Sequence, residues 1–292
     1  KDQDAIAGED PTTAQIDADL KLLAGTTRAV RTYSSIGTLG EIPALARKHG
    51  LKVMLGSWID SDRERNDREV EAAIRLANTH RNVTRILIGN EVVLRGDLPV
   101  EDLIAHLDRV RAATKQPVST AEPWHVWIKH PELVQHVDFI TVHMLPYWEG
   151  VEVEAAVGYV VAKLGEVRDA FPGKPIVIGE VGWPSEGRTR ESAVATTANE
   201  ALFLRRFLAY AEQQRLEYFV MEAFDQPWKA AAEGKVGAYW GVYDADRQQK
   251  FEFRAPIVRV PHWHVLAAAP TSRRSCCSSS HPMTGFESGP SS

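Results

Sequence analysis

Two glutamates stand where short apolar runs stop. Glu91 follows residues 86–88 of the run "ILIGNEV", with Asn90 directly before it, and Glu180 follows residues 176–178 of "PIVIGEVGWPS". Two facing carboxylates suit the cleavage of a glycosidic bond, in which one protonates the leaving oxygen and the other attacks the anomeric carbon or activates water. A helix-capping or arginine-pairing role is the alternative for either glutamate alone. Finding two of them, each behind an apolar run and a glycine, favours the catalytic interpretation.

Aromatic residues recur near the same positions. An indole ring is a flat apolar surface that covers the C–H face of a sugar, so a mouth lined by such rings predicts a glycan cleft. Core packing beneath loops is the alternative for any single one. The residues in question are Tyr33, Trp58, Trp124, Tyr147, Trp148, Trp183, Trp228 and Trp240.

Other polar residues near these positions receive a more modest interpretation. His143 is expected to contact substrate or to be a satisfied polar residue of its strand. The alternating histidines of "HWH" (262–264) are only a weak metal signal, and we expect no metal or cofactor. Four further acids are expected to be substrate contacts, arginine partners or loop anchors rather than a third catalyst: Asp60, Glu122, Glu149 and Glu222.

The elements that must position these residues alternate along the chain. Continuously apolar strands are predicted over 28–34, 51–59, up to Glu91, 117–122, 137–145, 175–180 and 217–224. Helices are predicted between them, over about 11–24, 39–49, 63–80, 99–113, 126–136, 152–171 and 192–214. This alternation is typical of a parallel sheet covered by helices. No G-x-G-x-x-G follows the first strand, so we expect an α/β (β/α)8 TIM barrel. Its first strand would precede Lys1.

The bulk composition excludes several classes of protein. The chain has 292 residues and a formal net charge of −5, so no basic surface for nucleic acid is expected. No apolar run reaches the length of a membrane span, and the first residues lack the apolar core of a signal peptide. We expect a barrel domain over 1–253, a C-terminal extension over 254–270 and a disordered Ser-rich tail over 271–292, which holds both cysteines.

Five stretches together resemble glycoside hydrolase family seventeen, a family of retaining (β/α)8 glycosidases. They are "VRTYS" (30–34), "IGNEV" (88–92), "GEVGWPS" (179–185), "EAFDQPWK" (222–229) and "YWGVYDAD" (239–246). The resemblance runs from about residue 10 to about residue 253, and the overall pattern is similar to the compact bacterial branch. The chain departs from plant members at Gln226, where they carry an acidic residue.

The resemblance implies roles for individual residues. Glu91 would be the general acid/base at the fourth barrel strand, and Glu180 the nucleophile at the seventh. Asn90 would bind the sugar 2-hydroxyl, and Tyr33 would line the cleft near the nucleophile. Residues Trp183 and Lys229 would be cleft residues. From their positions near strand ends we add Trp124, His143, Tyr147, Trp148, Glu222 and Trp228 as expected substrate-binding residues.

The same resemblance implies action on β-1,3-glucan by double displacement, ending in hydrolysis or transglycosylation. It also implies a periplasmic or secreted location and a membrane β-glucan synthase as a partner; we expect a monomer. Two other functions stay open at this point. One is a non-catalytic glycan-binding barrel or accessory domain of a β-glucan synthase. The other is a retaining glycosidase of another family that acts on mannan or xylan.

Overall fold

A parallel sheet rolled around a central axis forms the middle of the protein. The computed structural model describes residues 3–4 and 7–253. Among these residues, seven strands pair in chain order, and together they make the nearly closed TIM barrel that the alternation predicts. The strands are β1 (Ala29–Arg31), β2 (Lys52–Ser57), β3 (Val83–Asn90), β4 (Val118–Pro123), β5 (Ile140–Met144), β6 (Ile176–Val181) and β7 (Tyr218–Val220).

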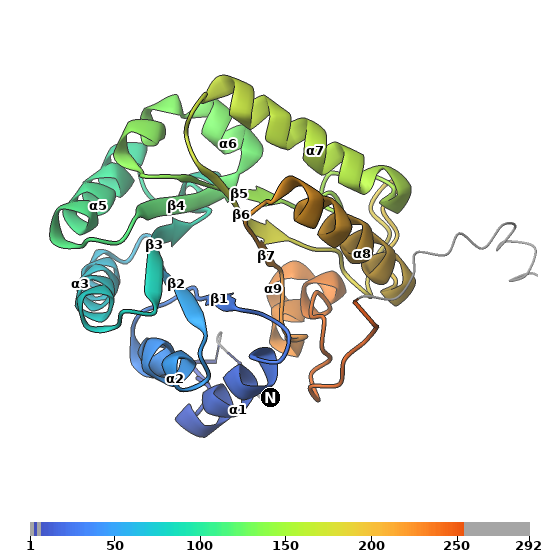
Figure 1. The fold of residues 1–292 in the computed structure, drawn as a ribbon, viewed down its shortest axis with the longest axis horizontal. Helices are drawn as coiled ribbons and strands as arrows, with labels where there is room; N and C mark the ends of the chain where they lie inside the picture. Colours follow the sequence, from blue (N-terminus) through green and yellow to red (C-terminus); the bar gives the residue numbers. More distant parts are fainter. Residues whose placement is uncertain (1–2, 5–6, 254–292) are drawn as a thin grey trace, which may run out of the picture. The chain divides into compact units, whose positions relative to one another are not determined.

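Helices surround the ring of strands (Figure 1). The α-helices are α1 (Thr13–Leu23), α2 (Ile42–Lys48), α3 (Arg63–Thr79), α4 (Val92–Arg95), α5 (Val100–Ala113), α6 (Trp124–Lys129), α7 (Val153–Ala170), α8 (Thr197–Gln214) and α9 (Ala230–Glu233). Short 3-10 helices are η1 (Gly37–Glu41), η2 (Pro131–His136), η3 (Pro227–Lys229) and η4 (Lys235–Ala238). The helix expected over 126–136 is divided at Pro131, because proline lacks the N–H that would continue α6.

Local sequence signals explain where the outer helices begin. Helix α1 starts after Thr12, whose side chain accepts from the amide of Gln15 while Gln15 Oε1 accepts from the Thr12 amide at 2.8 Å. This reciprocal capping box starts the helix at Thr13, about two residues later than the predicted start at residue 11. Helix α3 has a simpler cap: the Asp62 side chain accepts from the amide of Arg65.

Burial separates the inner strands from the two outermost ones. Strands β2 to β6 are largely buried, whereas every residue of β1 and β7 is partly exposed. Among the described residues, β1 pairs only with β2 and β7 only with β6. One-sided pairing explains why both are three residues long, although the sequence predicts strands over 28–34 and 217–224.

Two apolar clusters fill the fold. The larger one packs the helices onto the outside of the sheet. The smaller one contains Met54, Leu87, Ala121 and Val177, one residue from each of four strands, with Phe139 beside them and Phe219 of β7 against them. Alternating inward side chains of this kind fill the interior of a small barrel. Apolar side chains therefore fill the interior of the barrel below the carboxyl ends of the strands. Within the described part of the chain, no helix has the length and hydropathy needed to cross a membrane.

The remaining domain predictions concern residues that are not described. The extension over 254–270, the Ser-rich tail over 271–292 and the histidines of "HWH" all lie outside the described residues.

Candidate active site

Glu91 and Glu180 meet at the carboxyl ends of their strands. Glu180 lies in β6 and is 5% exposed, while Glu91 directly follows β3. One carboxylate oxygen of each, together with a ring nitrogen of His143, lie within 4.8 Å of one another. His143 of β5 stands between the two acids: Nδ1 is 2.8 Å from Glu91 Oε1, and Nε2 is 3.5 Å from Glu180 Oε1. The structure thus brings together the two residues that the sequence selects.

The backbone turns sharply to present Glu91. Gly89 has φ 86°, and a Cβ there would lie 2.5 Å from a methyl group of Val92, so only glycine fits. Glu91 itself adopts a left-handed conformation with φ 55° and ψ 32°. Its amide donates to the Ala121 carbonyl of β4 at 2.7 Å. The strand therefore ends and α4 begins within two residues, and the Glu91 side chain reaches His143 of β5.

Two hydrogen-bond donors and a neighbouring histidine hold Glu180 as an anion. Burial opposes its ionisation, but the charges of His143 and Arg31 and the hydrogen bond from Tyr33 outweigh it and lower the pKa of Glu180. Arg31 Nη1 donates to Glu180 Oε1 at 3.0 Å, and the Tyr33 hydroxyl donates to the same oxygen at 2.9 Å. Desolvation and the charge of Glu180 raise the pKa of Tyr33 well above its usual value, so the phenol remains a donor.

Arg31 is the functional residue that the sequence analysis missed. Its side chain is only 4% exposed. Besides Glu180, it contacts the Gly179 carbonyl at 2.8 Å through Nη1 and Asn90 Oδ1 at 2.5 Å through Nη2. It therefore ties Glu180 to Asn90, the residue before Glu91. The motif "VRTYS" contains it, but a strand arginine is ordinarily taken as a surface residue; its inward direction appears only in the barrel.

Glu222, Gln226 and Lys229 form a second polar cluster after β7. Lys229 Nζ lies 2.6 Å from Glu222 Oε2, and the Gln226 amide donates to the same oxygen. Burial raises the pKa of Glu222 to about 7 although Lys229 and Gln226 act to lower it. The charges of Glu222 and Lys229 also act on Tyr33 and Glu180, respectively. The cluster therefore lies beside the acid pair.

The aromatic residues divide by exposure. Tyr147 and Trp183 have no exposed surface, and Trp240 is 1% exposed, so these rings pack in the core and offer no face to a sugar. Tyr147 contacts both Trp183 and Trp240 edge-on. The expectation that Tyr147 and Trp183 contact substrate is not met in this conformation. Partly exposed rings that can contact a ligand are Tyr33, Trp58, Trp124, Trp148 and Trp228.

The remaining acids have structural partners. Asp60 forms an ion pair with Arg65 and accepts from the Trp58 indole at 3.1 Å. Glu122 is fully buried and accepts from two backbone amides of α4. Glu149 is exposed. Loop anchoring, one of the roles expected for this group, describes Asp60 and Glu122.

Glu91, His143 and Glu180 are also the set of described residues that could hold a cation. The guanidinium of Arg31 already supplies positive charge to Glu180 at 3.0 Å. A metal ion would have to compete with this contact and with the hydrogen bond between His143 and Glu91. The donor set therefore fits acid–base and nucleophilic chemistry by two carboxyl groups better than metal binding.

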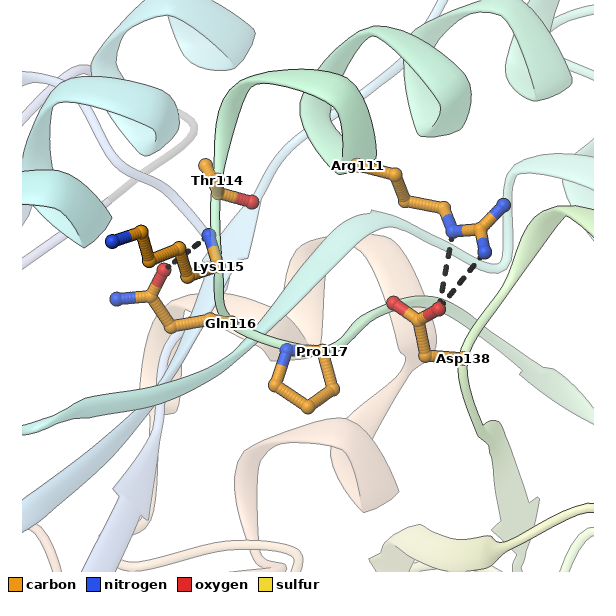
Figure 2. Close-up of a pocket in the computed structure, with 6 residues that line it drawn as sticks. All are labelled: Arg111, Thr114, Lys115, Gln116, Pro117 and Asp138. Atoms are coloured by element: carbon orange, nitrogen blue, oxygen red, sulfur yellow. Dashed lines mark hydrogen bonds and ion pairs between the residues drawn. The ribbon is translucent and has the colours of Figure 1, made fainter.

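A pocket at the opposite end of the strands has a different character. It is lined by Arg111, Thr114, Lys115, Gln116, Pro117 and Asp138 (Figure 2). Arg111 is paired with Asp138 at 2.9 Å, and Asp138 also accepts from the amide of Val118, the first residue of β4. No aromatic ring lines it, and its charges serve the joints between α5, β4 and β5.

Comparisons with known proteins agree with this geometry. The glucan 1,3-beta-glucosidase of Schizosaccharomyces pombe is 29% identical over 254 residues, which cover 80% of this chain and 78% of that protein. A glycoside hydrolase family 17 beta-1,3-glucanosyltransferase from Rhizomucor miehei matches with a TM-score of 0.75 and 30% identity, covering 84% of this chain and 93% of that one. An active-site mutant of the Rhizomucor enzyme, solved in complex with laminaritriose, matches equally well, with a TM-score of 0.76.

A more distant neighbour shares the fold alone: an endo-laminarinase from Formosa, with a TM-score of 0.71 and 20% identity. The curated relative and the glucanosyltransferase named above are fungal, so membership of a compact bacterial branch receives no support from them. The sequence also matches the BtgE/BtgC glycoside hydrolase domain over residues 3–241. Strand-end acids on a barrel, the relatives and the domain match all agree: the chain belongs to the BtgE/BtgC glycoside hydrolase family.

Proposed function

We propose that the protein cleaves β-1,3-glucan by double displacement, with Glu180 as nucleophile and Glu91 as general acid/base. The observation that carries the proposal is the approach of the two carboxylates: one oxygen of Glu91 lies within 4.8 Å of one oxygen of Glu180. Retaining glycosidases hold their carboxyl groups about 5–5.5 Å apart, whereas inverting ones need about 6.5–9.5 Å to admit a water molecule. The names of the fungal relatives support the β-1,3-glucan substrate.

The contacts of Glu180 support its role as nucleophile. Arg31, Tyr33 and His143 all contact Oε1. Among the described residues these contacts all fall on Oε1, which leaves Oε2 to attack the anomeric carbon. The lowered pKa keeps the carboxylate ionised for this step.

Glu91 occupies a more open position, which suits proton transfer. Its side chain is 24% exposed, compared with 6% for that of Glu180. Glu91 would protonate the glycosidic oxygen as the bond to the leaving sugar breaks. After the glucosyl–Glu180 ester forms, the Glu91 carboxylate would accept a proton from the incoming hydroxyl. Asn90, oriented through its Oδ1 by Arg31, can donate its amide N–H to the sugar 2-hydroxyl.

The acceptor decides the outcome of the second step. Water gives hydrolysis and a second glucan gives transglycosylation, and both outcomes are named among the relatives. A retaining mechanism permits either result because the covalent intermediate is the same. We further propose an extracellular or cell-wall location, where β-1,3-glucan is encountered. The monomeric state and a β-glucan synthase partner stay predictions.

Analysis of products from laminari-oligosaccharides tests the proposal. Products longer than the substrate identify transfer, and shorter products alone identify hydrolysis. Glu180→Gln should abolish turnover while leaving oligosaccharide binding measurable by calorimetry. With an activated aryl glycoside and azide, Glu91→Ala should yield a β-glycosyl azide and Glu180→Ala an α-glycosyl azide, because azide attacks opposite faces in the two variants.

Glu101→Gln, an exposed change on α5, serves as the matched control and should retain wild-type turnover. Turnover by Glu180→Gln at the wild-type rate, or azide products of the opposite configuration, would contradict the assignment of the two acids.

A further inference from the structure

Glu122 is a fully buried acid that the proposed reaction does not use. It lies in β4, has no exposed surface, and follows Ala121, whose carbonyl accepts the amide of Glu91. Glu122 Oε1 accepts from the Val93 amide at 2.8 Å, and Oε2 accepts from the Leu94 amide at 3.3 Å. Both oxygens therefore hold the first turn of α4, directly after Glu91.

The backbone at Glu91 requires such support. A left-handed conformation at a residue other than glycine is unfavourable and persists only where surrounding contacts fix it. Helix α4 has only four residues, and the side chain of its N-cap residue, Glu91, does not accept from the first amides of the helix. A helix this short is not stable in water without contacts from the rest of the fold. The contacts that fix Glu91 thus come from β4, through the Ala121 carbonyl and the Glu122 carboxyl group.

We propose that Glu122 is a positioning residue for the general acid/base: by binding the Val93 and Leu94 amides it fixes the turn that aims Glu91 at the glycosidic oxygen. The inference rests on the proposed function, because it assigns Glu122 a part in the proton transfer made by Glu91. Glu122 has no exposed surface and so cannot touch a glucan itself.

The electrostatic setting of Glu122 agrees with a role that justifies its burial. Desolvation raises the pKa of Glu122 to about 7, against the two backbone hydrogen bonds and the charge of His143, which lower it; the charge of Glu91 raises it further. An apolar residue would avoid this desolvation but would leave two amides of the Glu91 turn without acceptors. The carboxyl group supplies two acceptors at the spacing that the turn needs.

Leaving-group dependence tests the proposal. In a 2,4-dinitrophenyl β-laminaribioside, the dinitrophenolate departs without acid assistance. A sugar leaving group requires that assistance. Glu122→Ala should lower kcat/KM for laminari-oligosaccharides by about 10²-fold and for the dinitrophenyl substrate by less than about threefold. Glu122→Gln keeps one acceptor and should show the same pattern with about a tenfold loss on the oligosaccharide. It provides the test if Glu122→Ala does not fold.

Two comparisons make the result decisive. Glu200→Gln, another fully buried glutamate but one on α8, should show no leaving-group dependence beyond that of the wild type. Glu91→Ala should show the strongest dependence. If Glu91→Ala shows none, the acid/base assignment itself is wrong. If Glu91→Ala shows it while both Glu122 variants lose equal activity on the two substrates, or lose none, the positioning role is refuted and the proposed function stands.

Discussion

Removing the hydroxyl group of Tyr33 should move the acidic limb of the pH–rate profile. The limb of kcat/KM at low pH reports the ionisation of the nucleophile in the free enzyme. Burial acts to raise the pKa of Glu180, and His143, Arg31 and the Tyr33 hydrogen bond lower it. Tyr33→Phe deletes the 2.9 Å donor and leaves the ring in place. The pKa of Glu180 should rise, so activity should be lost at higher pH than in the wild type.

The size of the shift follows from the strength of one hydrogen bond. A hydrogen bond to a charged group contributes about 1.5–3 kcal/mol, which corresponds to about one to two pKa units. Arg31 Nη1 still donates to the same oxygen after the change and compensates for part of the lost donation. We therefore expect the lower end of this range, about one pH unit. Activity well above the limb should change much less than activity below it.

Initial rates on a laminari-oligosaccharide across the acid range measure the limb directly. Tyr210→Phe, which removes a phenol hydroxyl from α8, is the matched control and should leave the limb in place. A uniform loss at all pH values, with the limb unmoved, would refute the reasoning. It would mean that Tyr33 acts on the substrate rather than on Glu180.

Three further predictions concern the support of the site. Arg31→Lys replaces a fork that contacts Glu180, Gly179 and Asn90 by a single ammonium group, and kcat/KM should fall by about 10²-fold with little change in melting temperature; wild-type kinetics would contradict the network. Trp183→Ala should reduce the free energy of unfolding by about 3–5 kcal/mol, measured by denaturant titration, because the indole is fully buried; a raised KM at unchanged stability would instead make it a cleft residue. Burial raises the pKa of Glu200 from 4.5 to about 9, although Lys250 acts to lower it. Between these two pH values the folded state therefore holds a proton on Glu200 that the unfolded state has lost. Stability should therefore fall as pH rises through this window, and Glu200→Gln should raise the melting temperature more at about pH 8 than at about pH 5; an equal effect at both would show that Glu200 is ionised in the fold.

The sequence predicts the barrel because its main signal is local. Apolar runs of strand length alternate with amphipathic helices, and a glutamate behind each of two such runs is placed by the fold at the carboxyl end of the sheet. Glu91 and Glu180 could therefore be selected without knowing any contact between them. The resemblance to glycoside hydrolase family seventeen added the numbers of the barrel strands that carry the two acids and the expected role of each acid.

The limits of local reasoning appear in the aromatic residues. Trp183 and Trp228 look alike in the sequence, because each lies just beyond a predicted strand. Yet Trp183 is fully buried and donates to the Val194 carbonyl, while Trp228 is partly exposed. The loops that fold over the strand ends decide which ring faces a cleft. The paths of these loops cannot be predicted from a short stretch of sequence. The lengths of β1 and β7 likewise depend on what pairs with their outer edges.

By itself, the sequence determined the architecture and selected the two acids of the proposed catalytic pair, since both follow from periodicity and from where strands end. Only the tertiary structure decided how the pair is tuned. Arg31 reaches Glu180 across 149 positions of the chain, His143 reaches Glu91 across 52, and Glu122 reaches Val93 across 29. The physical reason is that the ionisation and orientation of the two acids depend on desolvation and on charges a few ångströms away. The nearly closed barrel sets these distances, because it brings together strands that are far apart in the sequence.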